Sequence, residues 1–95
     1  MATKKEIIDK FEDYMSKPYS SWYVGISENP RNRLFKDHNV DEKNNRWTYN
    51  TASSSTIARE IEKYFLDLGC DGGPGGGDKD AKAVYAYKKT TNTNP

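Results

Sequence analysis

Residues 23–39 read YVGISENPRNRLFKDHN, and this stretch decides the fold because one structural pattern gives way to another within it. Its first part, extended to SWYVGIS at 21–27, is rich in strand-forming residues and predicts a β-strand. Gly25 inside that strand indicates a bulge or the close approach of a backbone or ligand. Asn29 then suits the N-cap of a helix at about 30–38, whose first residue is a proline. We therefore expect a strand, a turn and a helix here.

Working outward, hydrophobic spacing and turn residues predict the remaining elements. These are a helix at about 4–15, a strand at 46–52, a helix at 55–68, a glycine-rich loop at 69–82, a strand at 83–89 and a flexible tail at 90–95. The order α-β-α-β-α-β, with brief connections, predicts the α+β class. We expect a small, mostly antiparallel three-stranded sheet covered by about three helices.

Composition limits the classes of function. The 95 residues suffice for one domain, 1–95, and the net charge of +1 gives no overall field that attracts nucleic acid, so such a role needs a local basic patch. A single cysteine, Cys70, excludes an internal disulfide and favours a reducing compartment. The N-terminal residues are not apolar enough for a signal peptide or a membrane span. We therefore expect a cytoplasmic protein with no membrane partner, in the host cytoplasm if the gene belongs to a phage.

Basic side chains follow the turn after the first strand. Arg33 is able to form a forked pair of hydrogen bonds with phosphate oxygens, and Arg31 or Lys36 could assist it. Gly25 would let a ligand approach the strand closely. The same residues also fit a plain strand, a turn and a solvated basic helix, so both interpretations stay open.

Four other positions carry groups suited to acid–base or metal chemistry. His38, the single histidine, is able to act as a general acid or base, or simply to stabilise a helix end. Glu62 lies beside the apolar side of its helix, where a buried carboxylate needs a partner or a metal; pairing with a neighbouring cation on the surface is the alternative. Tyr85 and Tyr87 share one strand face, where they either pack across the sheet or direct a phenol into a cleft.

The order YVGIS, NP, NRL and then a histidine resembles the second half of the GIY-YIG nuclease signature. YVG stands where that family has YIG, and Asn29, Arg33 and His38 fall near the family's Asn, Arg and His or Tyr. IAREIEKYF resembles the family helix in which a metal-binding Glu follows an Ala by four residues, here Glu62. The resemblance covers residues 23–65, roughly half of the chain.

The sequence departs from the family pattern in three places. The first motif, GIY, should lie on a strand before YIG, and no such strand precedes Tyr23. A permuted arrangement would supply it if VYAYKK near the C-terminus paired beside SWYVGIS and contributed the first tyrosine. Arg33 and His38 are five residues apart, where the family usually has four, and the family's late Asn is missing. The resemblance is therefore to a divergent or permuted member.

The resemblance implies magnesium-dependent hydrolysis of a DNA phosphodiester. Tyr23, helped by His38 or Tyr87, would take a proton from the attacking water. Arg33 would stabilise charge on the phosphate, and Glu62 would hold the Mg²⁺. Substrate binding is assigned to Gly25, Asn29, Arg31, Lys36 and Tyr85.

A second hypothesis keeps the same scaffold without catalysis. The near-zero net charge favours it, because DNA affinity usually draws on many phosphate contacts. Such a protein would bind a protein partner or a nucleotide-like ligand, for example as an accessory protein of a phage or mobile element that inhibits a host protein. Nothing in the sequence predicts its oligomeric state.

Overall fold

The computed structural model describes residues 3–15, 18–72 and 80–94, and it confirms the predicted α+β class. Three strands form one sheet in the order β1-β3-β2, and both pairings are antiparallel. The bounds are Trp22–Ser27 for β1, Trp47–Thr51 for β2 and Ala83–Lys88 for β3. The C-terminal strand is thus central, and it pairs directly beside β1, as the permuted arrangement requires.

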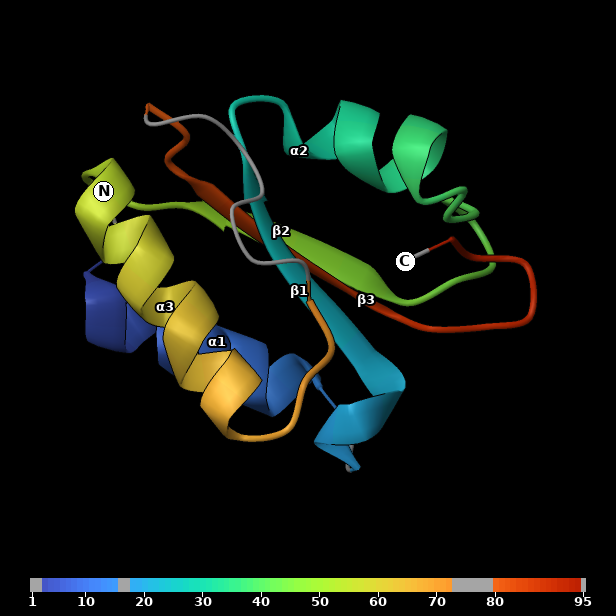
Figure 1. Ribbon diagram of the computed structural model, residues 1–95, viewed down its shortest axis with the longest axis horizontal. Coiled ribbons are helices and arrows are strands. Elements are labelled where there is room, and N and C mark those ends of the chain that lie inside the picture. The colour runs from blue at the N-terminus through green and yellow to red at the C-terminus, as the bar shows by residue number, and fades with distance from the viewer. Residues whose placement is uncertain (1–2, 16–17, 73–79, 95) are drawn as a thin grey trace.

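Helices cover both faces of the sheet (Figure 1). Helix α1 (Lys4–Tyr14) and helix α3 (Ser55–Asp67) lie together on one face. The short helix α2 (Pro30–Asn32) continues into a π-helical turn, η2 (Arg33–Asp37), and this pair lies over the other face. A single 3₁₀ turn, η1 (Tyr19–Ser21), leads into β1. The sheet is therefore the middle of three layers.

Local sequence explains where the two long helices begin and end. The Thr3 hydroxyl accepts a hydrogen bond from the Glu6 N–H, and the Glu6 side chain accepts one from the Thr3 N–H, which completes the capping box. Ser54 caps α3 by accepting from the Ile57 N–H. Gly69 follows α3 with a φ of 115°, a left-handed conformation that costs glycine little and ends the helix.

Alternating side chains build two apolar clusters, one on each face of the sheet. The larger lies under α1 and α3, and its largest fully buried members are Ile7, Phe11, Trp22, Val24, Ile26, Ile61, Phe65 and Val84. The smaller consists of Leu34, Val40, Tyr85 and Tyr87, with Tyr23, Phe35, Trp47 and Tyr49 packed against it. The sheet therefore has a mainly aliphatic face, on which Trp22 is the aromatic residue among the buried strand positions, and a tyrosine-rich face, which we call the aromatic face.

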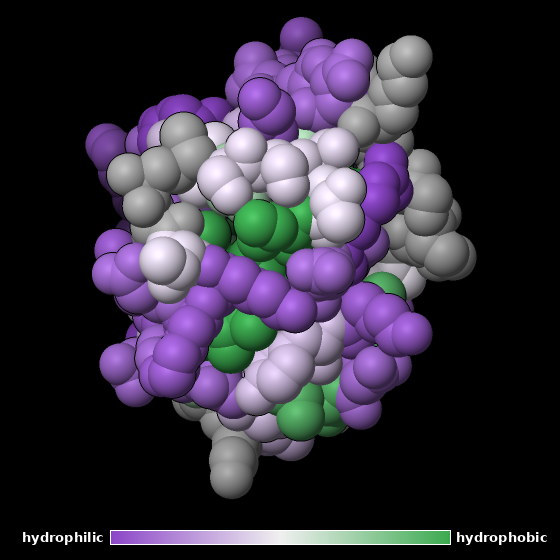
Figure 2. All heavy atoms as spheres, turned by 90° about the vertical axis from the view of Figure 1, so that its left-hand side faces the viewer, coloured by the Kyte–Doolittle hydropathy of each residue, from purple (hydrophilic) through white to green (hydrophobic). Residues whose placement is uncertain are grey.

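The outer face of the α1–α3 layer is mostly hydrophilic, with small apolar areas between polar side chains (Figure 2). Tyr64 and Leu68, which the helical spacing places on the apolar side of α3, are 37% and 41% exposed. Ile61 and Phe65 on the same helix are fully buried.

The outer edge of β1 is partly covered by residues 70–72. The Val24 N–H donates to the Asp71 carbonyl at 2.9 Å, and the Asp71 N–H donates to the Trp22 carbonyl at 2.8 Å. The rest of the predicted glycine-rich loop, 73–79, lies outside the described residues. Among the described residues, no helix has the length and apolar character needed to span a membrane.

Candidate active site

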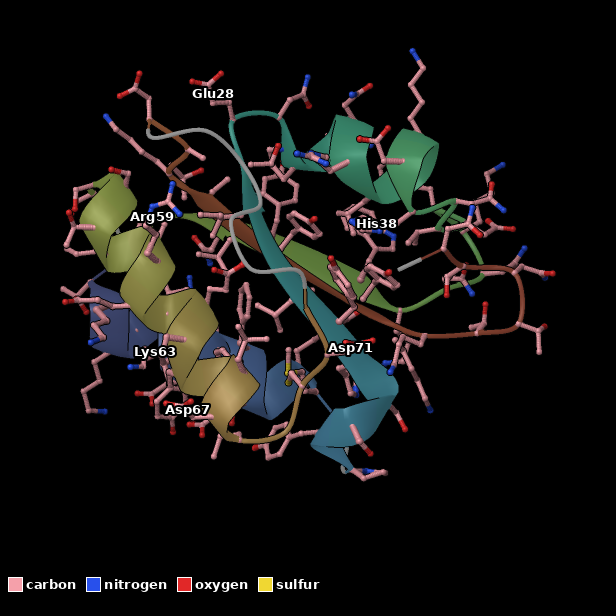
Figure 3. All side chains as sticks on the ribbon, in the orientation of Figure 1. Glu28, His38, Arg59, Lys63, Asp67 and Asp71 are labelled. Carbon is pink, nitrogen blue, oxygen red and sulfur yellow. The ribbon has the colours of Figure 1, made fainter. Side chains whose placement is uncertain are left out.

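Three tyrosines contact His38 on the aromatic face of the sheet. Figure 3 shows His38 beneath the helical segment that contains η2. Tyr23 of β1 and Tyr87 of β3 are directly opposed, and their rings stack with centroids 5.2 Å apart. The His38 ring lies 4.7 Å from the Tyr23 ring, 5.0 Å from the Tyr87 ring and 5.5 Å from the Tyr85 ring. The structure thus brings together four of the sequence-predicted site residues, which we call the tyrosine–histidine cluster.

The hydrogen bonds of His38 fix which of its nitrogens carries the proton. Nδ1 lies 2.6 Å from the main-chain oxygen of Asn94, which only accepts, so Nδ1 is the protonated nitrogen. Burial lowers the pKa of His38 below 6.5, and Arg33 acts in the same direction, against the bond to Asn94. The ring is therefore neutral near pH 7, and its free Nε2 accepts the Tyr85 hydroxyl proton at 2.8 Å. Tyr87 donates to the same Asn94 oxygen at 3.2 Å.

Gly25 makes room for the Tyr85 phenol. The two residues are directly opposed across β1 and β3, and the Tyr85 ring extends over Gly25. A Cβ atom at Gly25 would lie 2.5 Å from the Tyr85 hydroxyl oxygen and 2.6 Å from the ring carbon that bears it. Atoms cannot approach so closely, so any side chain here would displace the phenol. The space that Gly25 was predicted to leave for a ligand or a backbone is thus filled by the Tyr85 phenol, which belongs to the site itself.

The π-helical turn η2 explains how Arg33 and His38 share one side of the helix. The His38 N–H donates to the Arg33 carbonyl at 2.9 Å, which closes an i→i+5 turn. In an α-helix, residues five apart would differ by about 140° around the axis. The wider turn absorbs the extra residue and brings His38 back toward the direction of Arg33. The Arg33 side chain is 40% exposed and pairs loosely with Asp37 at 3.6 Å.

Glu62 is a buried carboxylate on α3. Its residue is 7% exposed, and its Oε2 atom has no hydrogen-bond partner within residues 3–15, 18–72 and 80–94. Burial raises the pKa of Glu62, while the positive charge of Arg59 acts against that shift. An unpartnered carboxylate oxygen suits a hard cation such as Mg²⁺. Among the described residues, no three or more acidic, histidine or cysteine side chains are grouped so that they could hold a metal ion together, so water and a phosphate would supply the other ligands.

Charges from both helical layers act on the Tyr85 phenol. Burial raises its pKa well above the usual value of 10.0, and Tyr23 adds to this. Arg33 lowers the pKa, whereas Glu62 and Asp37 raise it. Arg33 lies on η2 and Glu62 on α3, so charged residues from helices on opposite faces of the sheet influence this one phenol.

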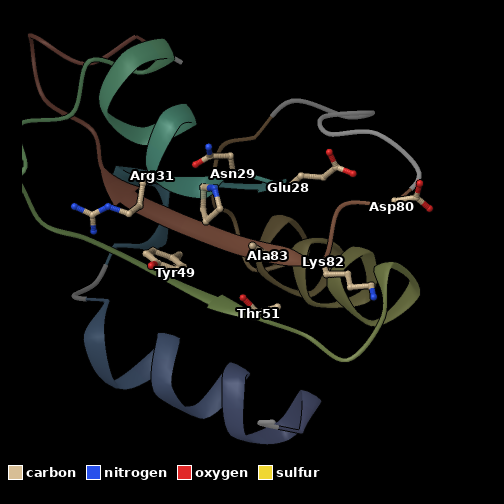
Figure 4. Close-up of a pocket in the computed structure, with 9 residues that line it drawn as sticks. Glu28, Asn29, Arg31, Tyr49, Thr51, Asp80, Lys82 and Ala83 are labelled. Carbon is tan, nitrogen blue, oxygen red and sulfur yellow. The ribbon is translucent and has the colours of Figure 1, made fainter.

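The remaining predicted site residues lie elsewhere. Asn29 and Arg31 line a separate open pocket of about 610 Å³ at the end of the sheet, together with Tyr49, Thr51 and Lys82 (Figure 4). Asn29 is also the N-cap of α2, because its side chain accepts from the Asn32 N–H at 3.1 Å. Arg31 pairs with Glu42 at 2.6 Å and lies over the rings of Phe35 and Trp47. Lys36 is exposed on η2, and no described contact joins it to the tyrosine–histidine cluster.

Sequence reasoning did not assign any role to Asn94, which lies in the expected flexible tail. The Asn94 N–H donates to the His38 carbonyl at 2.8 Å, in addition to the bond between its own carbonyl and the ring. Asn39, which has a left-handed φ of 56°, donates from its side chain to the Asn92 carbonyl. These contacts are made by main-chain atoms of the tail, so no residue type in the sequence could have indicated them.

No protein-family model, curated protein or solved structure matches this chain.

Proposed function

We propose that this chain is a divergent, permuted GIY-YIG-like endonuclease that hydrolyses DNA phosphodiesters with Mg²⁺. The observation that carries the proposal is the surroundings of the Tyr85 hydroxyl. It donates to His38 at 2.8 Å, it lies over Gly25, and the charges of Arg33 and Glu62 act on it. Hydrolysis of a phosphodiester needs these three functions: a base for water, a cation for the phosphate and a carboxylate for a metal.

The direction of the hydrogen bonds gives a path for the proton. The Tyr85 oxygen accepts a proton from an attacking water while its own proton passes to Nε2 of His38. His38 is neutral near pH 7 because burial lowers its pKa, so it is ready to accept. We therefore assign the base role to Tyr85 acting with His38, and we assign Tyr23 and Tyr87, which stack on each other, to packing against the imidazole.

Arg33 and Glu62 complete the proposed chemistry. The partly exposed guanidinium of Arg33 is available to a phosphate, because its pairing with Asp37 is long and solvent-exposed and therefore weak. Magnesium would neutralise charge on the leaving oxygen, and Glu62 is the residue that would hold it. Burial of Glu62 without a described hydrogen-bond partner leaves Oε2 free for that use.

Substitution of Arg33 tests this proposal. We expect Arg33→Ala to reduce magnesium-dependent cleavage of plasmid DNA by roughly 100- to 1000-fold, because transition-state charge would lose its main partner. Stability should change little, since the Arg33 side chain is partly exposed and its ion pair is weak. Lys10→Ala on α1 is the matched control, because it also removes one exposed positive charge. Equal cleavage by both variants would remove Arg33 from the mechanism.

The pocket lined by Arg31 and Tyr49 favours a second candidate, a non-catalytic binder of a nucleotide-like ligand. Tyr49 offers a ring for stacking, and Arg31 and Lys82 offer positive charge, although Glu28 and Asp80 also line the pocket. The cleavage assay and an NMR titration with a nucleotide together separate the candidates. Cleavage by the wild-type chain supports the nuclease, whereas nucleotide-induced shifts of amide resonances around the pocket, without cleavage and without Mg²⁺, support the binder.

A further inference from the structure

We infer that the C-terminal segment 90–94 is a positioning strap, whose Asn94 carbonyl holds His38 in the one tautomer that can accept a proton from Tyr85. This inference deepens the proposed function, on which its catalytic consequence rests. The placement of the imidazole protons, however, is a property of the folded chain whether or not it cleaves DNA. The tautomer of His38 and its catalytic consequence are therefore testable separately.

Two main-chain hydrogen bonds join the strap to His38. The Asn94 carbonyl accepts from Nδ1 at 2.6 Å, and the Asn94 N–H donates to the His38 carbonyl at 2.8 Å. Paired contacts of this kind fix the orientation of the imidazole as well as its distance from the strap. Nε2 is then left to face Tyr85. Without the strap, a neutral imidazole is free to carry its proton on Nε2, and the Tyr85 hydroxyl then loses its acceptor.

Several contacts hold the strap in place. Thr93 is 9% exposed, and its hydroxyl accepts from the Thr90 N–H at 3.0 Å and donates to the Thr90 carbonyl at 3.1 Å. The Asn39 side chain donates to the Asn92 carbonyl at 2.9 Å, and the Tyr87 hydroxyl donates to the Asn94 carbonyl at 3.2 Å. The strap is therefore attached along its length to the turn after η2 and to β3, and it positions His38 much as a carbonyl or carboxylate orients a metal-binding histidine.

The single histidine makes the tautomer directly measurable, because all imidazole signals in a ¹⁵N NMR spectrum belong to His38. At pH 8 the wild-type chain should show the Nδ1–H tautomer. Two variants should shift the population toward Nε2–H: a chain that ends at Thr90, and Asn94→Pro, which lacks the N–H that bonds the His38 carbonyl. Asn94→Ala is the matched control, since it keeps both main-chain groups, and it should retain Nδ1–H.

Persistence of Nδ1–H in the shortened chain overturns the inference, provided that its amide spectrum shows a folded sheet. Where the shortened chain does not fold, Asn94→Pro decides in the same way. In cleavage assays Asn94→Pro should lower kcat about 10- to 100-fold relative to Asn94→Ala, with KM little changed, since DNA contacts are retained. A tautomer shift in a chain whose wild-type form cleaves no DNA would leave the strap established and refute the nuclease.

Discussion

At the scale of single residues, the candidate site depends on a glycine and a phenol that occupy one space. Tyr85 is 3% exposed and lies over Gly25, so its hydroxyl has little freedom to leave His38. In most strands a glycine weakens the element because it offers no side chain to pack. Here the opposite ring covers the glycine, and this packing sets the position of the proposed base.

A substitution at Gly25 tests that packing. We expect Gly25→Ala to lower the free energy of unfolding by about 1–3 kcal/mol, because the new methyl group overlaps the Tyr85 ring. The cost should fall sharply in a Tyr85→Ala background, where the ring is gone. Urea denaturation of the four chains in this cycle gives both values. An equal cost in both backgrounds would show that the strand itself, and not the phenol, requires glycine.

Glu62 shows a different relation between stability and function at the same scale. Its Oε2 atom is buried without a described hydrogen-bond partner, and burial raises the pKa of Glu62, so the charged form opposes folding near pH 7. Without Mg²⁺, Glu62→Gln should therefore be at least as stable as the wild type, by an increment on the order of 1 kcal/mol. With free Mg²⁺ at ten times its Kd, the wild type should gain about 1.4 kcal/mol and the variant nothing.

Thermal unfolding with and without Mg²⁺ measures both effects. Glu60→Gln is the matched control, because Glu60 is two residues away and exposed, and its ion pair with Lys4 at 3.4 Å is weak. That variant should respond to Mg²⁺ as the wild type does. Stabilisation of Glu62→Gln by Mg²⁺ to the wild-type extent would place the metal elsewhere.

At the scale of elements, helices and strands were predictable because each has a strong local signal. Capping residues and apolar spacing predicted α1 and α3, and every predicted helix or strand end lies within one residue of the observed end. The pairing of β3 beside β1 followed only from the resemblance, since strand-forming sequence does not specify a partner. The central position of β3 was not predicted at all.

For the candidate site, the sequence predicted which residues belong to it but not how they are arranged in space. Tyr23, His38, Arg33 and Glu62 were chosen from the sequence. The structure packs Tyr23 against His38, whereas Arg33 and Glu62 lie on helices that cover opposite faces of the sheet (Figure 1). The π-helical turn that aligns Arg33 with His38 was not predicted from the sequence of residues 33–37.

At the scale of the whole molecule, the buried imidazole links folding to pH. Because burial lowers the pKa of His38 below 6.5, the unfolded chain takes up a proton at a higher pH than the folded chain does. The stability that the neutral ring contributes is therefore complete above pH 6.5 and is lost as the pH falls through the lower pKa of the folded state. The other groups around the ring are the Arg33 and Asp37 charges, three phenols and the Asn94 carbonyl.

Other buried groups do not obscure this effect. Glu62 acts in the opposite sense, because its raised pKa lets the folded chain hold a proton above 4.5, so its contribution declines as the pH rises. Burial raises the pKa of Cys70 to about 11, beyond the range of interest. A difference between the wild type and a variant that lacks only the imidazole cancels both contributions.

His38→Gln is that variant, because glutamine retains hydrogen-bonding groups without titrating. We expect the free energy of unfolding of the wild type, relative to the variant, to fall between pH 6.5 and 5 with a slope of at most about 1.4 kcal/mol per pH unit. Urea denaturation at several pH values measures it. A relative stability that rises toward low pH would mean that the folded chain favours a charged imidazole. Nε2 would then donate to Tyr85 and could not accept its proton, and the proposed proton path would have to be abandoned.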